Sequence, residues 1–442
     1  MKLNRNTIDE IIQKRVISDI PGTALLIGQS GKIIFQKGYG FADIENNIPV
    51  GVDTPFIIAS ITKQFITMAI MILKEKGLIC YKESISRFFP DFPMYKDKVT
   101  IEHLMTHTSG IKDYFPTEGM EEFVNNKGNS LTQYDVLDII KDLGDLEFEP
   151  GTRFAYSNSA YVMLGIIIEK ISGMTFCEFL KKSIFEPLNM NLTVAPESYL
   201  EVIENLAVGY KKDTKNQFER EPYNNVTIGW ADGNMVSTIG DLFKWHNALY
   251  TEKLVKKETL EEAYKPFILE NGESTNYGFG FWLNDRRGVR EVWHTGLTIG
   301  YTLRFSRFIE EDIVVIMLTN LSTAQIDDTF NSIVELVLEE KLKPVKYTVV
   351  DESKLGSKVG KYEGRSSLCN ITYDNELNKL RLEYEVCNDA LIMSGNVTLS
   401  PINEKLFRLD SSDDYYIEFD EKDEDLSRLT FDFHGYKQYF HK

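Results

Sequence analysis

The segment from Phe65 to Leu73 constrains the fold most, because it is apolar on nearly every side. A helix that is apolar all round has to be buried inside the protein, and Gly77 is a typical residue for its end. Ser60-Ile61-Thr62-Lys63 stands at the start of this run. In a helix, residues three apart are neighbours on one face. The sequence therefore predicts a buried helix with a hydroxyl and an amine close together at its first turn.

This serine and lysine have two interpretations: a nucleophile with its base, or an ordinary helix-capping serine with a surface lysine one turn later. The tetrapeptide alone is a weak signal, because a second copy occurs at Ser109-Gly110-Ile111-Lys112. Glycine is about 1 kcal/mol worse than alanine in a helix, so no helix is expected to hold Lys112 beside Ser109. Ser60 is therefore the better candidate nucleophile.

Two later elements carry further polar residues. Tyr156 and Asn158 lie two apart in a stretch rich in glycine, serine and asparagine, just before an apolar run. His294-Thr295-Gly296 follows a strand-like segment at 290–293. Each element alone has an ordinary interpretation, as a core tyrosine beside a turn asparagine or as a half-buried strand histidine. Only the three elements together, in this order, point to a site.

Together these elements resemble the penicillin-recognising serine hydrolases, and in particular the branch of class C β-lactamases, penicillin-binding relatives, D-aminopeptidases and related esterases. Two further phrases fit, at 104–111 and at 233–238 leading into Asp241-Leu242. The resemblance extends over roughly residues 7 to 340. It implies an α+β fold: an antiparallel sheet flanked by N- and C-terminal helices, with a helical subdomain inserted between the two halves of the sheet.

The resemblance also implies roles for single residues. Ser60 would be the nucleophile, Lys63 its partner, and Tyr156 would share the acid and base work. Asn158 would bond both the lysine and the substrate amide. The catalytic set that it implies is Ser60, Lys63, Tyr156, Asn158 and His294. Substrate would lie along Thr295, Gly296 and Leu297, with the backbone N–H groups of Ser60 and Leu297 as the oxyanion hole.

This chemistry sets a requirement on the pKa values of Lys63 and Tyr156. A free lysine titrates near ~10.4 and a free tyrosine near ~10, so neither is a base at pH 7. Lowering either pKa by ~3 units takes about 4 kcal/mol of differential interaction. Burial disfavours the lysine cation, and each group influences the charge of the other. The two would titrate as a coupled pair, so the sequence does not say which one is the base.

His294 departs from the class C β-lactamases, which usually carry lysine at this position. Histidine is mostly neutral at pH 7, so no permanent cation would face a substrate carboxylate. We therefore expect a serine hydrolase that acts on an ester or amide through an acyl-enzyme on Ser60. Turnover of a D-amino-acid amide, a D-peptide or an ester, or acylation by a β-lactam-like substrate, is favoured over efficient β-lactam hydrolysis. The alternatives are a non-hydrolytic penicillin-binding sensor and a catalytically inactive binding module.

Beyond Lys343-Pro344 the pattern changes to short alternating segments separated by turn residues, at 371–373, 380–384, 406–409, 416–419 and 429–433. Such spacing is typical of a small β-barrel or sandwich. The segment from Val359 to Glu363 resembles the start of the lipocalin-like domain that is appended to several family members. We therefore predict two domains, 1–343 and 352–442. Asp420 to Asp425 is expected to form an acidic hairpin loop.

Composition limits the partners. The formal net charge of -18 argues against nucleic acid and anionic membrane, and no run of ~20 apolar residues predicts a membrane span. A small molecule or peptide is the expected substrate, and a homo-oligomer is left open. The N-terminus shows no signal peptide, which makes the cytoplasm the default; a trimmed leader would make an extracellular or cell-surface location equally consistent.

Metal or cofactor binding is not expected from this sequence. His103 and His107 have a ligand-like i,i+4 spacing, but acidic or cysteine ligands in a zinc pattern do not accompany them. The four cysteines show no CxxC pair and are interpreted as ordinary thiols. Cys369 and Cys387 are the candidates for cross-strand neighbours.

Overall fold

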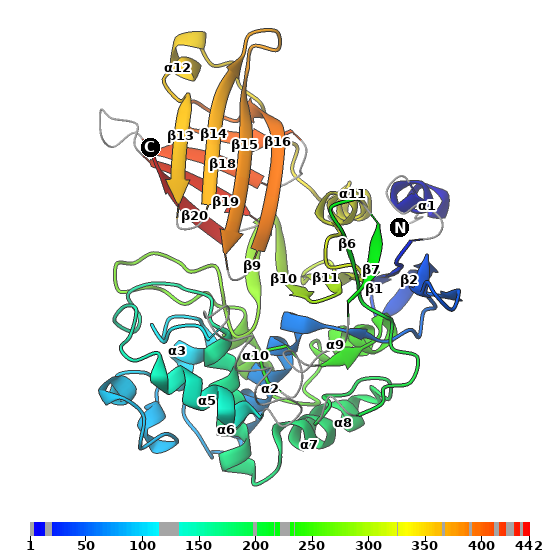
Figure 1. Ribbon diagram of the computed structural model, residues 1–442, viewed down its shortest axis with the longest axis vertical. Coiled ribbons are helices and arrows are strands. Elements are labelled where there is room, and N and C mark those ends of the chain that lie inside the picture. Colours follow the sequence, from blue (N-terminus) through cyan, green and yellow to red (C-terminus); the bar gives the residue numbers. More distant parts are fainter. Residues whose placement is uncertain are drawn as a thin grey trace. The chain divides into compact units, whose positions relative to one another are not determined.

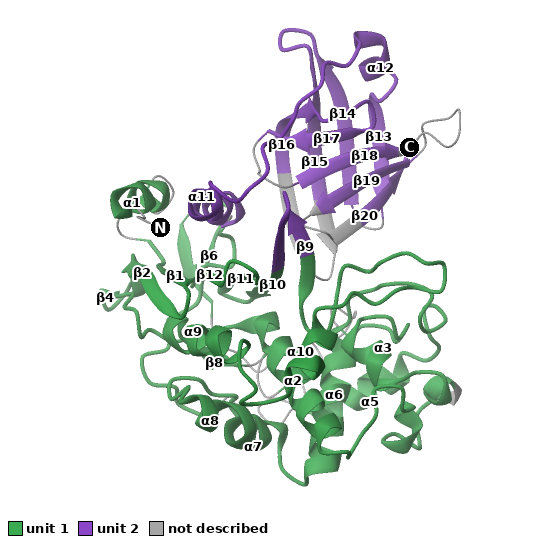
Figure 2. Cartoon of the chain, turned by 180° about the vertical axis from the view of Figure 1, so that it is seen from behind, with its two compact units in different colours: residues 1–283, 292–324 green, residues 284–291, 325–442 purple. Residues whose placement is uncertain are grey.

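The structure is a computed structural model, in which the chain forms two compact units (Figure 1). It describes residues 4–13, 20–114, 132–197, 201–215, 217–221, 230–233, 235–324, 326–364, 367–388, 391–410, 415–420, 428–433 and 436–442. The first unit comprises Met1–Leu283 with Val292–Ala324, and the second comprises Asn284–Glu291 with Gln325–Lys442 (Figure 2). Each unit has its own hydrophobic core, so we describe each by itself.

The first unit is built on an antiparallel sheet with the strand order β2-β1-β12-β11-β10-β9. The strands are β1 (Thr23–Gln29), β2 (Lys32–Tyr39), β9 (Trp282–Arg286), β10 (Val289–Thr298), β11 (Tyr301–Phe308) and β12 (Ile313–Thr319), and the tip of the β9–β10 hairpin belongs to the second unit. β1 pairs directly with β12, with Leu25 opposite Met317. The sheet therefore joins strands from both ends of the hydrolase segment, as the resemblance implies.

The sequence at 277–283, where apolar residues alternate, predicts a strand, but the strand in the structure starts later. β9 begins only at Trp282, and Tyr277 makes an isolated bridge with this residue. The cause is Gly280, whose φ of +77° turns the backbone away from the extended conformation. The alternating apolar residues of this segment therefore lie in a bent, buried loop that leads into the strand.

Between the two halves of the sheet, the described chain forms mostly helices and loops, as predicted. Their bounds are α2 (Thr62–Glu75), α3 (Ile101–Met105), α5 (Gln133–Asp142), α6 (Asn158–Ser172), α7 (Phe176–Leu180), α8 (Glu186–Leu188), α9 (Ile239–Ala248) and α10 (Lys257–Ala263). Every residue of α2 from Thr62 to Leu73 is buried, which confirms the helix predicted from its apolar pattern. α2 packs against α6 and α7, and α9 packs against β1 and β12.

The N-terminal helix α1 (Arg5–Gln13) is amphipathic and buries Ile8 and Ile12. Asp9, next to these residues on the helix, accepts hydrogen bonds from Lys37 Nζ at 2.8 Å and from Tyr39 Oη at 2.7 Å, both on β2. These contacts fix the helix against the edge strand of the sheet. The sequence predicts an amphipathic helix over 7–17, and its part at 14–17 lies outside the described residues.

The second unit contains a closed antiparallel barrel, which confirms the small β-domain predicted after residue 343. Its strands are β13 (Gly360–Gly364), β14 (Ser367–Asp374), β15 (Lys379–Asn388), β16 (Leu391–Pro401), β17 (Leu406–Leu409), β18 (Tyr415–Asp420), β19 (Arg428–Phe433) and β20 (Tyr436–His441). Aromatic rings fill its interior; those of Tyr384 and Phe431, for example, meet edge-to-face at 5.2 Å. The barrel is therefore a packed core in its described part.

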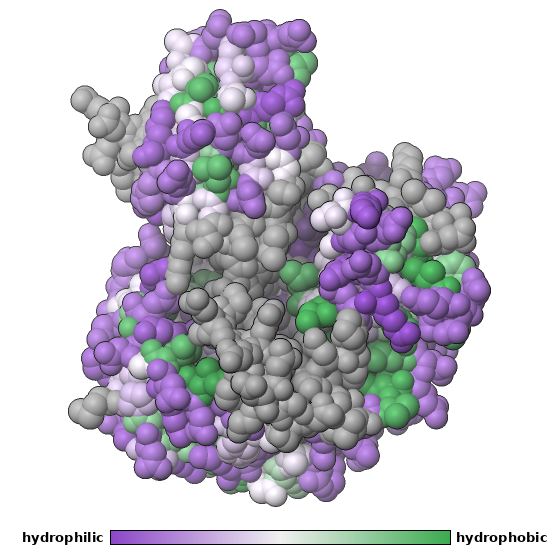
Figure 3. Space-filling model, in the orientation of Figure 1, coloured by the Kyte–Doolittle hydropathy of each residue, from purple (hydrophilic) through white to green (hydrophobic). Residues whose placement is uncertain are grey.

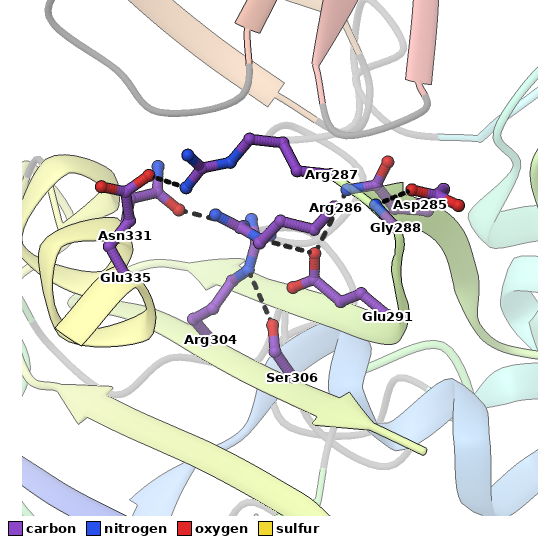
Figure 4. Close-up of polar contacts among 10 residues, drawn as sticks. Asp285, Arg286, Arg287, Gly288, Glu291, Arg304, Ser306, Asn331 and Glu335 are labelled. Carbon is purple, nitrogen blue, oxygen red and sulfur yellow. Dashed lines mark hydrogen bonds and ion pairs between the residues drawn. The ribbon is translucent and has the colours of Figure 1, made fainter. Parts of the chain in front are cut away.

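Helices α11 (Asp327–Leu338) and α12 (Glu352–Gly356) also belong to this unit. Figure 4 shows how α11 holds the tip of the β9–β10 hairpin. The fully buried Arg286 donates from Nε to Glu291 and from Nη2 to Asn331 of the helix, each at 3.1 Å, and Arg287 pairs with Glu335. These contacts place hairpin tip and helix in one unit, although the predicted boundary near residue 343 separates them from the barrel.

The barrel register answers the question about the cysteines. Cys369 has a free thiol and lies opposite Tyr384, whereas Cys387 lies opposite Ile392, so the two cysteines are not directly opposite each other. The predicted acidic loop begins at Asp420, the last residue of β18, and its remainder at 421–425 lies outside the described residues.

The described surface is mainly hydrophilic on the face shown in Figure 3. Within the described parts of the chain, no single helix is long and apolar enough to span a membrane; α6 and the segment Phe176–Leu188 meet that length and composition only jointly, with a 75° bend between them.

Candidate active site

The backbone in front of Ser60 is held in a strained turn. β5 (Phe56–Ile57) pairs with β8 (Val236–Ser237), and Ile58 N donates to Met235 O at 2.8 Å. The next residue, Ala59, has a φ of +46°, a left-handed conformation that costs an L-residue roughly 1–2 kcal/mol. Ser60 follows in a short 3-10 turn that leads into α2. The phrase at 233–238 therefore supplies the strand that positions Ser60.

Lys63 is fully buried one turn after Ser60, and its amine joins three groups. Nζ lies 3.1 Å from Ser60 Oγ, 2.9 Å from Asn158 Oδ1 and 2.7 Å from the main-chain oxygen of Asp232. Burial lowers the pKa of Lys63 to about 8, while the charges of Asp232 and Asp113 act in the opposite direction. About a tenth of the amines are then neutral at pH 7, which meets the requirement set out from the sequence.

Tyr156 lies close to the amine, with its ring centroid 4.9 Å from Lys63 Nζ. Burial raises the pKa of Tyr156 well above its ordinary value, and a hydrogen bond with Ser60 opposes this rise. The phenol therefore keeps its proton at pH 7. The opposite pKa shifts favour Lys63 as the proton acceptor and Tyr156 as the proton donor.

Asn158 is the first residue of α6, whose start is capped by Ser157. Its side-chain oxygen faces Lys63, and its Nδ2 donates to Asp113 Oδ2 at 3.1 Å. The structure thus brings together the serine, lysine, tyrosine and asparagine that the sequence assigned to one site.

His294 lies in β10 and is buried. Its Nδ1 is 2.6 Å from the carbonyl oxygen of Thr295, and its Nε2 is 3.1 Å from Tyr277 Oη. A carbonyl only accepts, so Nδ1 carries the proton and Nε2 accepts from the tyrosine. Burial lowers the pKa of His294 to about 3. The imidazole is therefore neutral at physiological pH.

The residues after His294 approach the turn at Ser60 closely. A Cβ atom on Gly296 would lie 2.5 Å from the carbonyl oxygen of Ile58 and 3.3 Å from the Cβ of Ala59. Only glycine allows this contact between β10 and the strained turn. Thr295 is half-buried beside it and the Leu297 side chain is exposed, so this end of β10 borders the turn that leads to Ser60.

Sequence reasoning missed several residues that support this site. Asp232 accepts from Lys63 through its main chain and from Tyr114 Oη through its carboxylate, at 2.8 Å. Burial raises the pKa of Asp232. His107 is buried with its ring 4.2 Å from that of Tyr156, and its Nδ1 accepts from Ser157 N at 3.0 Å. His107 belonged to a phrase recognised only by resemblance, and no spacing in the sequence connects Asp232 to Lys63.

The rival candidates in the sequence have other partners. Lys112 Nζ donates to the carbonyl oxygen of Leu143 at 2.9 Å, and Ser109 Oγ accepts from Ile111 N at 3.2 Å, so the second Ser-x-x-Lys copy forms no serine–lysine pair. His103 Nδ1 accepts from Thr100 N in the cap of α3. In the part of the chain that the structure describes, no three histidine, cysteine or acidic residues are grouped to hold a metal ion.

Comparisons with known proteins agree with this geometry. The chain is 35% identical over 309 residues to a penicillin-binding protein of Bacillus subtilis (strain 168), and the match covers 67% of each chain. The matched part spans 64–67% of the length of the curated relatives that it matches.

Two solved structures are similar. The octameric penicillin-binding protein homologue from Pyrococcus abyssi is 27% identical, with a TM-score of 0.67 and 98% of each chain covered. The D-amino acid amidase from Ochrobactrum anthropi SV3, complexed with L-phenylalanine amide, is 26% identical, with a TM-score of 0.63, covering 75% of this chain and 98% of that one. Residues 8–335 match the family described as Beta-lactamase. With Ser60, Lys63, Tyr156 and Asn158 gathered in the matched segment, the chain belongs to the beta-lactamase family.

Proposed function

We propose that the protein is a serine hydrolase that cleaves ester or amide bonds through an acyl-enzyme on Ser60. The observation that carries this proposal is the buried Lys63 amine, 3.1 Å from Ser60 Oγ and with a pKa lowered to about 8. A lysine that is partly neutral at pH 7 and bonded to a serine hydroxyl is an activated nucleophile pair. An N-cap serine with a surface lysine would have neither the burial nor the hydrogen bond.

In the acylation step, Ser60 Oγ attacks the carbonyl carbon of the substrate and passes its proton to neutral Lys63 Nζ. The carbonyl oxygen becomes an oxyanion, and the backbone N–H groups of Ser60 and Leu297 are proposed to bind it. The bond to the leaving alcohol or amine then breaks, and Tyr156 donates the proton that this group takes up. Tyr156 regains a proton from the Lys63 ammonium, so the resting protonation states return.

In the deacylation step, water attacks the Ser60 ester and gives a proton to the same network. The carboxylic acid product leaves and Ser60 recovers its hydroxyl hydrogen. Asn158 holds Lys63 throughout by its Oδ1 at 2.9 Å. No cofactor enters either step.

The charges around the nucleophile bear on the substrate. His294 is neutral, so position 294 provides no cation for a substrate carboxylate, and the carboxylates of Asp113 and Asp232 lie close enough to act on Lys63. This arrangement favours neutral esters and substrates with a free amine. We therefore propose a D-amino-acid amide, a D-peptide or an ester as the substrate class, which the similarity to a D-amino acid amidase supports.

The second candidate is a penicillin-binding protein that is acylated but deacylates slowly. It is favoured by the similarity to a Bacillus subtilis penicillin-binding protein. Hydrolysis and slow deacylation share the acyl-enzyme on Ser60 and differ only in how long it lasts.

A labelling experiment tests the acyl-enzyme. The purified protein is treated with a fluorophosphonate and, separately, with a fluorescent penicillin, and the modified peptide is mapped by mass spectrometry. We expect label on Ser60 alone and none in Ser60→Ala, with Ser109→Ala as the matched control that labels normally. Label that survives Ser60→Ala would refute the proposal.

Turnover separates the two candidates. A panel of p-nitrophenyl esters, D- and L-amino-acid p-nitroanilides and a chromogenic cephalosporin should show multiple turnovers of an ester or D-anilide. A stoichiometric burst without turnover on every substrate would instead favour the penicillin-binding candidate. Because a similar solved protein is octameric, the oligomeric state should be measured in the same preparation by light scattering.

A further inference from the structure

We propose that Asp113 is a positioning residue for this reaction, because it fixes the side-chain amide of Asn158 in the orientation that presents Oδ1 to Lys63. The inference rests on the proposed function, since Asn158 acts through the Ser60–Lys63 pair. Asp113 lies in the loop after α3, 45 residues before Asn158 in the sequence.

The hydrogen bonds define the orientation. Asp113 Oδ2 accepts from both the main-chain N of Asn158, at 3.0 Å, and its Nδ2, at 3.1 Å. An ionised carboxylate only accepts, whereas an amide has one donor end and one acceptor end. The bond to Asp113 therefore requires Nδ2 on its side and leaves Oδ1 on the other, where Lys63 Nζ donates to it at 2.9 Å.

A flipped amide would have two unfavourable contacts. Asn158 Oδ1 would face the Asp113 carboxylate, and Nδ2 would face the Lys63 amine, so acceptor would meet acceptor and donor would meet donor. Leaving a polar group unsatisfied costs about 1–3 kcal/mol when it is buried; Asn158 is half-buried, so each end of the amide would lose part of that free energy. One orientation is thus selected by Asp113 from one side and by Lys63 from the other.

The position of Asp113 does not depend on the side chain that it orients. The first N–H groups of a helix have no partner within the helix, and Asp113 accepts two of them at the start of α6, from Asn158 N at 3.0 Å and from Ser159 N at 3.1 Å. The next residue, Tyr114, donates from its main-chain N to Ser159 Oγ at 2.9 Å. Backbone bonds anchor the carboxylate, and the anchored carboxylate then orients the amide.

Asp113 also acts on Lys63 through its charge. The charged or titratable groups that bear on this amine, taken from the described residues, are Asp113, Asp232, His107, His294, Tyr156 and Tyr161. Burial keeps the pKa values of both histidines well below 7 and raises those of both tyrosines. Between about pH 6 and pH 9 these four groups stay neutral. The two carboxylates are then the neighbours whose charge raises the pKa of Lys63.

Two substitutions separate orientation from charge. Asp113→Asn keeps the shape but loses the charge and one acceptor. We expect kcat/KM for a p-nitrophenyl ester to fall about 100-fold, the cost typical of a misplaced catalytic group, and the acid limb of its pH profile to move to lower pH. Asp113→Glu keeps the charge but displaces the oxygens. We expect a similar fall in kcat/KM with the acid limb in its wild-type place.

Asp241→Asn is the matched control. Asp241 is buried near the start of a helix, α9, and its Oδ2 accepts from Leu192 N at 2.8 Å and from Thr193 Oγ at 2.9 Å. Like Asp113, it accepts main-chain and side-chain hydrogen bonds from a distant segment, but it is not among the groups that act on Lys63. We expect Asp241→Asn to lower Tm while kcat/KM and the pH profile keep their wild-type values.

A double-mutant cycle with Asn158→Ala tests the route of the effect. If Asp113 acts through the amide, Asp113→Asn should lower kcat/KM less than about threefold further when Asn158 is already alanine. Full additivity of the two losses would overturn the proposal. So would an Asp113→Asn variant that loses Tm like Asp241→Asn but keeps wild-type kcat/KM and pH dependence.

Two outcomes need separate treatment. If circular dichroism shows Asp113→Asn to be unfolded, Asp113→Glu decides alone, and wild-type kcat/KM in that variant would overturn the proposal. Labelling that survives Ser60→Ala would instead refute the proposed function. Labelling that depends on Ser60, together with wild-type behaviour of both Asp113 variants, would refute only this inference.

Discussion

The buried amine of Lys63 is expected to lower the stability of the protein. Lysine has a pKa near ~10.4 in an unfolded chain, whereas burial lowers the pKa of Lys63 to about 8 in the folded protein. The folded state therefore binds this proton less tightly than the unfolded state. By linkage, protonation of Lys63 costs the folded state about 3 kcal/mol at pH 7 and about 2 kcal/mol at pH 9.

The sign follows from the two pKa values. Below about pH 8 both states carry the proton and the full cost is present. As the pH rises from about 8 to about 10.4, the folded state releases its proton first and stability is regained. Lys63→Met removes this dependence, because a thioether does not titrate. Relative to that variant, the wild type should gain about 1 kcal/mol of unfolding free energy between pH 7 and pH 9.

The test uses the pH dependence, because the absolute difference contains other terms. Lys63→Met also removes a donor from Asn158 Oδ1 and from the Asp232 carbonyl, at about 1–3 kcal/mol for each acceptor left unsatisfied. Urea unfolding at pH 7, 8 and 9, followed by circular dichroism, measures the free energies, with the exposed Lys253→Met as control. If wild type and Lys63→Met differ by the same amount at all three pH values, the reasoning is wrong.

Three further results are expected. Acylation of Ser60, followed by stopped-flow, should speed up about tenfold from pH 7 to pH 9, because the neutral fraction of Lys63 rises through a pKa of about 8; a flat profile would contradict this. Gly296→Ala should lower kcat/KM about 100-fold, because its Cβ would lie 2.5 Å from Ile58 O, and a wild-type rate would show that β10 can retreat without cost. Phe431→Ala in the barrel core should lower the unfolding free energy by about 3–5 kcal/mol while Ser60 labels at the wild-type rate; a slower rate in the folded variant would assign the barrel a part in the chemistry.

The elements with regular periodicity were predictable. The apolar run after Lys63 predicts a buried helix. The alternation at 380–384 and at 429–433 predicts strands with one face in a core. The strand predicted at 277–283 was wrong in its first half. The apolar residues before Trp282 alternate as in a strand, but the segment also contains Gly280, which turns the backbone there. A positive φ at a glycine is decided by the surrounding packing, which periodicity does not contain.

The site was predictable in part for the same reason. Ser60 and Lys63 are connected by helix geometry, which the sequence displays directly. Asp232 contributes its main-chain oxygen. Every residue has such an oxygen, so the residue type does not reveal this contact. Asp113 lies 45 residues from the asparagine that it contacts, so only the folded chain shows the pair. The groups that tune the chemistry are thus less visible in the sequence than the groups that perform it.

A lower pKa of Lys63 would raise the rate of the proposed reaction and lower the stability of the folded protein. Each unit by which burial lowers it costs about 1.4 kcal/mol of stability at pH 7, but the gain in rate is limited, because the neutral fraction cannot exceed one. From a pKa of about 8, complete deprotonation would increase the neutral fraction at pH 7 only about tenfold. It would also weaken the bonds of Nζ to Asn158 and Asp232, since charge-assisted hydrogen bonds are roughly twice as strong as neutral ones. In the proposed mechanism, the carboxylates of Asp113 and Asp232 therefore keep most of Lys63 protonated at pH 7, which strengthens its hydrogen bonds and lowers the rate by no more than about tenfold.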